Sequence, residues 1–267
     1  MDNTRRTLIK SILAGGVLAG GLPGSVLASG LPGMGPGKTE IEPDMTGERY
    51  GDEGKSFTCL FQGDSITDGN RSRNNDWNHV MGHGYAYLIA SRLWYDHPAK
   101  GYHFFNRGVS GNKVSDLASR WQEDTVDIKP DLLSILVGVN DLNSFFNKGD
   151  ASPVTAAVFE SGYRALLQET KEKLPETRIV ICEPFLLPVG KVKDDWTAWS
   201  TEMNVRQGVV RKLAGEAGAI YVPLQEAFDE ACKRAPADYW IWDGIHPMPA
   251  GHELIARQWI HLVRTII

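Results

Sequence analysis

Two segments at opposite ends of the sequence hold the residue types that could hydrolyse an ester. Residues 63–69 (GDSITDG) place Ser65 directly after a short apolar run, and residues 242–247 (WDGIHP) place Asp243 three residues before His246. A neutral imidazole can take the proton of a serine hydroxyl, and a carboxylate can orient that imidazole and stabilise its protonated form. The pattern predicts Ser65 as nucleophile, His246 as general base and Asp243 as the residue that orients the base.

Two further segments offer hydrogen-bond donors for the anion that forms during acyl transfer. Residues 106–112 (NRGVSGN) contain Gly111, whose backbone N–H can approach a ligand closely, and residues 138–141 (GVND) contain Asn140, whose side-chain amide donates without titrating. The backbone N–H of Ser65, at the start of a predicted helix, is a third donor. Each segment alone is typical of an ordinary turn or helix cap. Their occurrence together favours an oxyanion hole.

In this order, the four segments resemble the signature of the SGNH, or GDSL-type, hydrolases, and they extend from residue 63 to residue 247. The resemblance implies a flavodoxin-like, three-layer α/β/α sandwich around a five-stranded parallel sheet of order 2-1-3-4-5. It assigns the nucleophile to Ser65, the oxyanion donors to Ser65, Gly111 and Asn140, and the acid–base pair to Asp243 and His246.

Residues 108–117 (GVSGNKVSDL) and 120–124 (RWQED) are similar to the serine acetylxylan esterases of this superfamily, as are residues 183–185 (EPF) and 250–252 (AGH). Those enzymes remove acetyl groups from xylan or xylo-oligosaccharides. The resemblance implies a carboxylic ester hydrolase that acts on short-chain esters through an acyl-enzyme, with a small-molecule or oligosaccharide ester as substrate.

Short apolar runs alternate with amphipathic ones, which predicts a parallel sheet covered on both faces, with ligands at the carboxyl ends of the strands. Residues with chemistry should therefore follow strands rather than lie inside helices. The predicted strands are Phe57–Phe61, Tyr102–Asn106, Leu132–Val137, Ile179–Cys182 and Ala219–Pro223. The predicted helices are Tyr85–Tyr95, Lys113–Ile128, Thr155–Lys173, Glu202–Ala217 and Gly251–Thr265.

The composition is that of an ordinary globular protein, with 42% hydrophobic and 23% charged residues among 267. The net charge of -5 gives no basic surplus for a nucleic-acid partner. The histidines and the three cysteines show no metal-ligand spacing, so no metal or cofactor is expected, and the cysteines are expected to be buried, unpaired thiols.

The N-terminus resembles a twin-arginine export signal. Arg5 and Arg6 precede a glycine-rich apolar run over residues 11–22. Residues 26–28 (VLA) then place small side chains at the two positions that a signal peptidase recognises. We expect a signal peptide over residues 1–28, a Gly/Pro-rich arm over 29–55, the hydrolase domain over 56–267, and an exported, periplasmic or secreted protein. A short membrane anchor is the alternative, but the run is too short and too rich in glycine to favour it.

Tryptophans in predicted loops favour a sugar as the substrate, because aromatic faces pack against sugar rings. Trp242, which adjoins Asp243, and Trp77 and Trp196 are the candidate substrate contacts. No long apolar segment typical of a lipase lid appears. The alternatives are a broad short-chain esterase or lysophospholipase, and a non-catalytic carbohydrate-binding protein. A homo-oligomer is compatible with the sequence.

Overall fold

The computed structural model describes residues 56–74, 78–147, 149 and 152–267. The predicted signal peptide and arm lie outside the described residues, as does Trp77. Among the residues that are described, no helix is both long and apolar enough to span a membrane.

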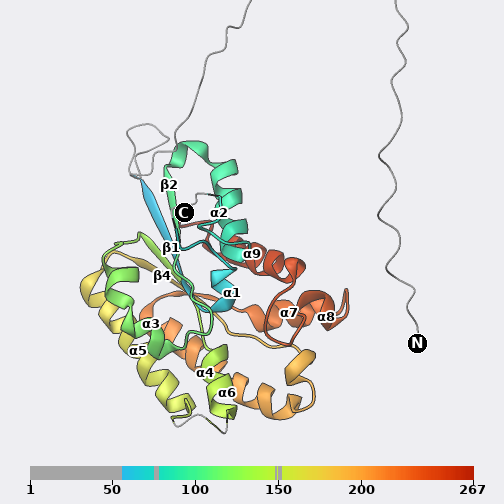
Figure 1. Cartoon of the computed structure of the whole chain (residues 1–267). Coiled ribbons are helices and arrows are strands. Elements are labelled where there is room, and N and C mark those ends of the chain that lie inside the picture. The colour runs from blue at the N-terminus through green and yellow to red at the C-terminus, as the bar shows by residue number, and fades with distance from the viewer. Residues whose placement is uncertain (1–55, 75–77, 148, 150–151) are drawn as a thin grey trace, which may run out of the picture. The chain divides into compact units, whose positions relative to one another are not determined.

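Five short strands form one parallel sheet in the order β2-β1-β3-β4-β5 (Figure 1). This confirms the order and the α/β class expected from the sequence. The strands are β1 (Phe57–Gly63), β2 (Tyr102–Asn106), β3 (Leu132–Leu136), β4 (Arg178–Cys182) and β5 (Ile220–Val222). The central strand β3 is buried along its whole length, because helices cover both faces of the sheet.

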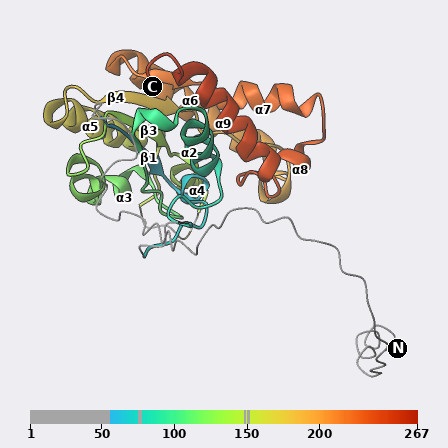
Figure 2. The same cartoon turned by 90° about the horizontal axis from the view of Figure 1, so that it is seen from above.

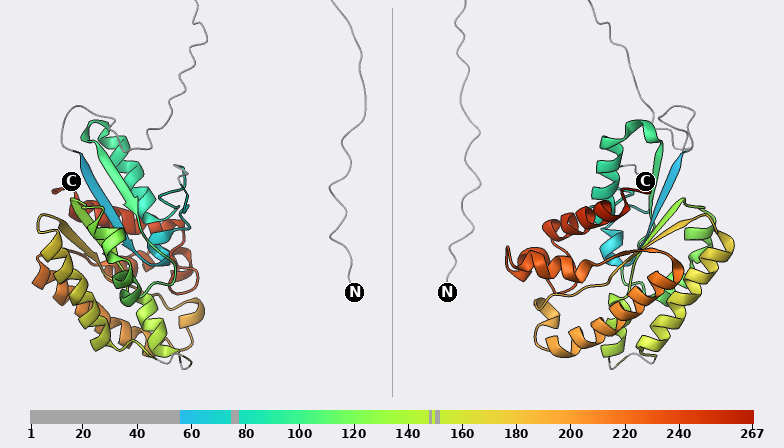
Figure 3. Two further views of the ribbon diagram at one scale, coloured as in Figure 1. Left: turned by 60° about the vertical axis from the view of Figure 1, so that its left-hand side comes forward. Right: turned by 180° about the vertical axis from the view of Figure 1, so that it is seen from behind.

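Two layers of helices enclose the sheet (Figures 2 and 3). The helices are α1 (Ser65–Asp68), α2 (Tyr85–Asp96), α3 (Val114–Ser119), α4 (Val139–Phe146), α5 (Ala156–Lys173), α6 (Trp196–Ala217), α7 (Leu224–Cys232), α8 (Ala237–Trp240) and α9 (Pro249–Val263). One apolar cluster packs α2, α7 and α9 against one face, and a second packs α3, α5 and α6 against the other. The neighbours Leu60 and Phe61 belong to different clusters, since successive side chains of a strand point to opposite faces.

The register of the sheet brings three predicted functional segments to one edge. Phe61 of β1 pairs with Asn106 at the end of β2, and Gly63 of β1 pairs with Leu136 at the end of β3. The chain turns sharply after Gly63, where a side chain would lie 2.3 Å from both the Leu136 carbonyl and the Thr67 hydroxyl oxygen. Only glycine fits this turn, which starts the helix that carries Ser65.

The structure differs from the predicted helices at Lys113–Ile128, at the start of α6, and at α4 and α8, which were not predicted. The predicted helix Lys113–Ile128 is divided, because α3 ends at Ser119 and a π-helical turn follows over Gln122–Val126. The buried Gln62 amide donates to the Asp124 carbonyl at 2.8 Å and holds this turn.

Helix α6 begins at Trp196 rather than Glu202, and α4 was not predicted. The sequence GVND at the start of α4 is typical of a turn. Gly138, at φ 135°, nevertheless lets the chain pass from β3 directly into a helix.

Candidate active site

The structure brings the side chains of Ser65, His246 and Asp243 into one hydrogen-bonded chain. The Ser65 Oγ lies 2.8 Å from His246 Nε2, and His246 Nδ1 lies 2.7 Å from Asp243 Oδ2. Nδ1 donates to the carboxylate, so Nε2 is left as an acceptor for the serine proton. This arrangement can raise the nucleophilicity of a hydroxyl.

A tight loop before α9 holds the imidazole in place. Ile241 and Pro247 form an antiparallel bridge across the loop. The second carboxylate oxygen of Asp243 accepts the backbone N–H groups of Ile245 at 3.0 Å and His246 at 2.7 Å. The loop follows α8 and not a strand, so the expectation that every functional segment follows a strand is wrong for this one.

The electrostatics of the loop favour an ionised Asp243. Burial acts to raise the pKa of its carboxyl, but the hydrogen bonds from the His246 backbone, the His246 ring and the Ile245 backbone outweigh burial and lower the pKa below its usual value. The lowered pKa favours a charged Asp243, which can stabilise an imidazolium at His246.

The three predicted donors for an anion each have an N–H group available. Ser65 is the first residue of α1, so its N–H has no acceptor within the helix. The Gly111 backbone has φ 84°, a conformation that favours glycine, and its N–H has no acceptor among the residues that the structure describes. Asn140 uses one amide hydrogen on the Asn112 carbonyl at 3.1 Å, which leaves the other free to donate.

Ser65 begins α1, at a helix start as expected, and Asn140 is the second residue of α4, a helix that was not predicted. In both cases the helix starts at once after the strand. The residue therefore sits at a helix N-terminus, where the dipole favours a developing negative charge.

Asp68 is a residue at this site that the sequence reasoning missed. It is buried on α1, one turn after Ser65, and its carboxylate accepts the Ser110 N–H and hydroxyl, each at 3.0 Å. Arg73 donates to both carboxylate oxygens, at 2.9 and 2.6 Å. Asp68 therefore ties the helix of the nucleophile to the loop that carries Gly111.

Burial acts to raise the pKa of Asp68, but the bonds from Arg73 and Ser110 outweigh it and hold the pKa below its usual value. Asp68 could have been identified from the sequence, because it lies in the GDSITDG segment three residues after Ser65, on the same face of the predicted helix.

Two more carboxyl groups are buried beside the site. Burial raises the pKa of Asp64 to about 7, opposed by a bond from the Ile66 N–H, and the nearby charge of Asp141 raises it further. Burial likewise raises the pKa of Asp141 to about 6, opposed by a bond from the Val114 N–H. Both side chains hold backbone N–H groups, those of Ile66 and Val114, close in sequence to the candidate donors Ser65 and Gly111.

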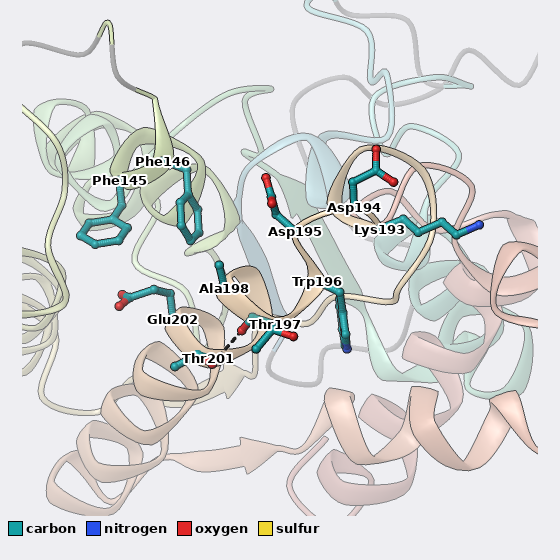
Figure 4. A pocket seen from close by; sticks show the side chains of 10 residues that line it. All are labelled: Phe145, Phe146, Lys193, Asp194, Asp195, Trp196, Thr197, Ala198, Thr201 and Glu202. Atoms are coloured by element: carbon teal, nitrogen blue, oxygen red, sulfur yellow. Dashed lines mark hydrogen bonds between the residues drawn. The ribbon is translucent and has the colours of Figure 1, made fainter.

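The candidate substrate contacts differ in position. Trp242 is 62% exposed, and its ring stacks on the His246 imidazole with 6.2 Å between centroids and 23° between planes. Trp196 is half-buried at the start of α6 and is one of the residues around a separate pocket (Figure 4). The described part of the chain holds no group of three or more His, Cys, Asp or Glu side chains that could bind a metal ion.

The three cysteines are unpaired; Cys59 and Cys182 are buried, and Cys232 is half-buried. Burial raises the pKa of Cys182 to about 12, and β3 separates its strand from that of Cys59. These thiols are unreactive at neutral pH.

The sequence matches the GDSL-like Lipase/Acylhydrolase family over residues 61–254. It is 33% identical over 211 residues to an acetylxylan esterase of Geobacillus stearothermophilus, a match that covers 78% of this chain and 94% of that protein.

Solved structures of similar proteins agree with this family assignment. A protein from Parabacteroides merdae, assigned as a GDSL-like lipase, shares 41% identity at a TM-score of 0.75, over 81% of this chain and 99% of that one. A crystal structure of the Geobacillus acetylxylan esterase shares 31% identity at a TM-score of 0.69, over 81% and 96% of the two chains. Variants of that enzyme described as catalytic mutants replace a serine, an aspartate or a histidine with alanine.

Proposed function

Because the chain belongs to the GDSL-like lipase/acylhydrolase family and is a carboxylic ester hydrolase, we propose that it removes O-acetyl groups from carbohydrates of the xylan type. The observation that carries this proposal is the hydrogen-bonded chain Ser65–His246–Asp243, which lies next to an exposed tryptophan. The identity to an acetylxylan esterase over most of the chain supports the choice of an acetylated saccharide.

The first half of the reaction forms an acetyl-enzyme. The Ser65 oxygen attacks the carbonyl carbon of the acetyl ester while His246 Nε2, 2.8 Å away, takes the hydroxyl proton. The ionised Asp243 carboxylate stabilises the imidazolium that forms. The protonated imidazole then gives its proton to the sugar oxygen as the C–O bond breaks, and the deacetylated sugar leaves.

The second half repeats these steps with water. His246 takes a proton from a water molecule while the water oxygen attacks the acetyl carbonyl carbon. The protonated imidazole then gives this proton to the Ser65 oxygen as its bond to the acetyl group breaks, and acetate is released. In both halves, the negative oxygen of the tetrahedral intermediate accepts hydrogen bonds from the Ser65 and Gly111 N–H groups and the Asn140 amide. Such donors act only where the charge develops, so they stabilise the transition state more than the substrate.

Trp242 supports a sugar as the alcohol part of the ester. Its ring lies parallel to the imidazole that must protonate the leaving oxygen, and more than half of it is exposed. A sugar ring that packs on this face would place an acetylated hydroxyl beside His246.

The proposal is tested by two series of substrates. One varies the acyl chain from two to eight carbons on a common alcohol, and the other compares acetylated xylose, glucosamine, rhamnogalacturonan and glycerol. We expect the highest kcat/KM for acetyl over longer chains and for acetylated xylosides over the other acetates. Preference for eight carbons would instead favour the broad esterase or lysophospholipase.

Export belongs to the same proposal. We propose that residues 1–28 form a twin-arginine signal, followed by an arm over 29–55, and that residues 56–267 act outside the cytoplasm. Replacing Arg5 and Arg6 together by lysine should leave the protein in the cytoplasmic fraction of the producing cells. Unchanged export of that variant would contradict this route.

A further inference from the structure

A pocket lies between the end of α4 and the first turns of α6, and has a volume of about 670 Å³ (Figure 4). That volume is in the range of pockets that hold small organic ligands, roughly 300–1,000 Å³. Its wall includes Phe145, Phe146, Lys193, Asp194, Asp195 and Glu202.

Both walls of this pocket continue from segments of the active site. Helix α4 carries Asn140 in its first turn and Phe145 in its last, which at a helical rise of about 1.5 Å per residue puts them about 8 Å apart along the helix. On the other side, the Lys191 N–H donates to the Asp243 carbonyl at 3.1 Å, shortly before the chain reaches Asp194. Ser65 does not line the pocket, but its walls adjoin the segments that carry Asn140 and Asp243, where a sugar next to the acetylated one could bind.

Aromatic rings form one side of the pocket and are held firmly. The Phe146 ring packs against Trp199 with 4.8 Å between centroids, and the Arg206 guanidinium lies 5.3 Å from the centroid of Phe145. Arg206 is fully buried and donates to the Val154 carbonyl. In Figure 4 the Trp196 indole extends away from these two rings, so Phe145 and Phe146 provide the apolar surface.

Three charged side chains of the loop before α6, those of Lys193, Asp194 and Asp195, line the pocket away from the rings (Figure 4). Glu202 lies near Phe145 and is paired with Arg206 at 3.0 Å, whereas the exposed side chains of Asp194 and Asp195 have no hydrogen bond or ion pair within the described residues. A carboxylate only accepts hydrogen bonds, so Asp194 and Asp195 can bind hydroxyl groups, and their two negative charges against the single positive charge of Lys193 disfavour a uronic acid or a phosphate. An aromatic surface facing such acceptors suits an uncharged ring with many hydroxyls.

We infer that this pocket is a subsite for an uncharged, unacetylated sugar ring next to the ring that carries the scissile acetyl group. The inference rests on the proposed function and deepens it: the enzyme would act on oligosaccharides better than on single sugars, and on neutral chains better than on those carrying glucuronic acid.

The test is the double substitution Asp194→Asn/Asp195→Asn, assayed on an acetylated xylo-oligosaccharide and on 4-nitrophenyl acetate. Asp195 precedes α6 without capping it through its side chain, so the change leaves the helix intact. We expect KM for the oligosaccharide to rise about three- to tenfold, with kcat and all constants for 4-nitrophenyl acetate unchanged. The matched control is Asp96→Asn, an exposed residue at the end of α2 at the opposite edge of the sheet, which should change nothing.

A second variant, Phe145→Leu, keeps an apolar side chain but removes the flat ring. It should raise KM for the oligosaccharide alone, after a thermal melt has shown that it folds.

Binding of deacetylated xylo-oligosaccharide, measured by calorimetry, separates the two proposals. If wild-type protein fails to deacetylate saccharides yet binds the oligosaccharide, and the double variant does not, the subsite stands and the proposed function falls. If wild type deacetylates the oligosaccharide and the double variant matches it in KM and in binding, the subsite is overturned and the proposed function stands. Absence of any binding to wild type also overturns the subsite.

Discussion

The Ser65 hydroxyl lies 2.8 Å from the imidazole of His246, a residue 181 positions later in the chain. This contact joins the end of β1, the second strand of the sheet, to the loop that precedes the last helix. One segment supplies the hydroxyl and the other supplies the base, so neither could act as a nucleophile–base pair alone. The contact therefore depends on the whole fold, and on how firmly Asp243 holds the imidazole.

Replacing Asp243 by asparagine should lower kcat by about 10³–10⁴-fold with little change in KM, because the imidazole loses the partner that fixes its tautomer. Steady-state kinetics on 4-nitrophenyl acetate measures this. The variant should keep the wild-type melting temperature within a few degrees, since an amide oxygen can still accept the Ile245 N–H. Near-normal kcat in a folded variant would mean that Asp243 has no part in orienting the base.

Replacing Asn140 by alanine should lower kcat by about 10²–10³-fold, equivalent to roughly 3–4 kcal/mol of transition-state stabilisation. The amide would be lost both as an oxyanion donor and as the group that binds the Asn112 carbonyl. Asn143→Ala is the matched control, because that side chain is exposed on the same helix. Equal effects of the two changes would rule out an oxyanion role for Asn140.

Replacing Asp68 by asparagine should lower kcat about tenfold and the free energy of unfolding by about 1–3 kcal/mol, because a buried charged partner of Arg73 and Ser110 disappears. Arg73→Ala should do less to kcat, since the bonds to Ser110 remain and the Arg73 side chain is half exposed. Kinetics and urea unfolding of both variants give the comparison. A larger kcat loss in Arg73→Ala would contradict the view that Asp68 acts by positioning the loop beside Gly111.

His252 should make the protein less stable in acid. Burial lowers its pKa to about 4, with repulsion from His83 and His246 adding to the effect, and its Nδ1 accepts the Tyr85 N–H at 3.2 Å. Between about pH 4 and 6.5 the unfolded chain binds a proton at this residue that the folded protein does not. Stability therefore rises with pH across this window and is lost on acidification, by up to about 1.4 kcal/mol per pH unit.

The substitution His252→Gln removes this titration, so the difference in unfolding free energy between wild type and variant should shrink from pH 7 to pH 4.5. Urea unfolding at several pH values measures it. A difference that does not change with pH would contradict a neutral, buried His252. Asp64 works in the opposite direction, since its raised pKa of about 7 makes stability fall as pH rises from about 4 to 7. The comparison with the variant isolates the histidine.

The sequence predicted the strands and the contacting residues Ser65, Asp243 and His246 because these lie in short, unambiguous patterns: apolar runs, a glycine turn, and a carboxylate three residues before a histidine. It did not predict α4, because the sequence GVND is compatible with both a turn and the start of a helix. The positive φ of Gly138 lets the chain enter the helix, and this conformation cannot be read from the sequence.

Other features depended on tertiary contacts that no local pattern contains. The π-helical turn at Gln122–Val126 is held by Gln62 from β1, about sixty residues earlier in the chain. The role of Asp68 appears only when Ser110 and Arg73 come to it from other segments. The pocket between α4 and α6 could not be predicted either, because one of its walls is a helix that the sequence did not reveal.

The most direct test of the central claim is to trap the covalent enzyme and find the residue that carries it. Treatment with a serine-directed phosphonate, followed by peptide mass spectrometry, should give one adduct per chain on Ser65. Ser65→Ala should give none, and its kcat should fall by about a thousandfold or more. His246→Ala should label far more slowly than wild type. An adduct on another residue, or full esterase activity in a folded Ser65→Ala variant, would contradict Ser65 as the nucleophile.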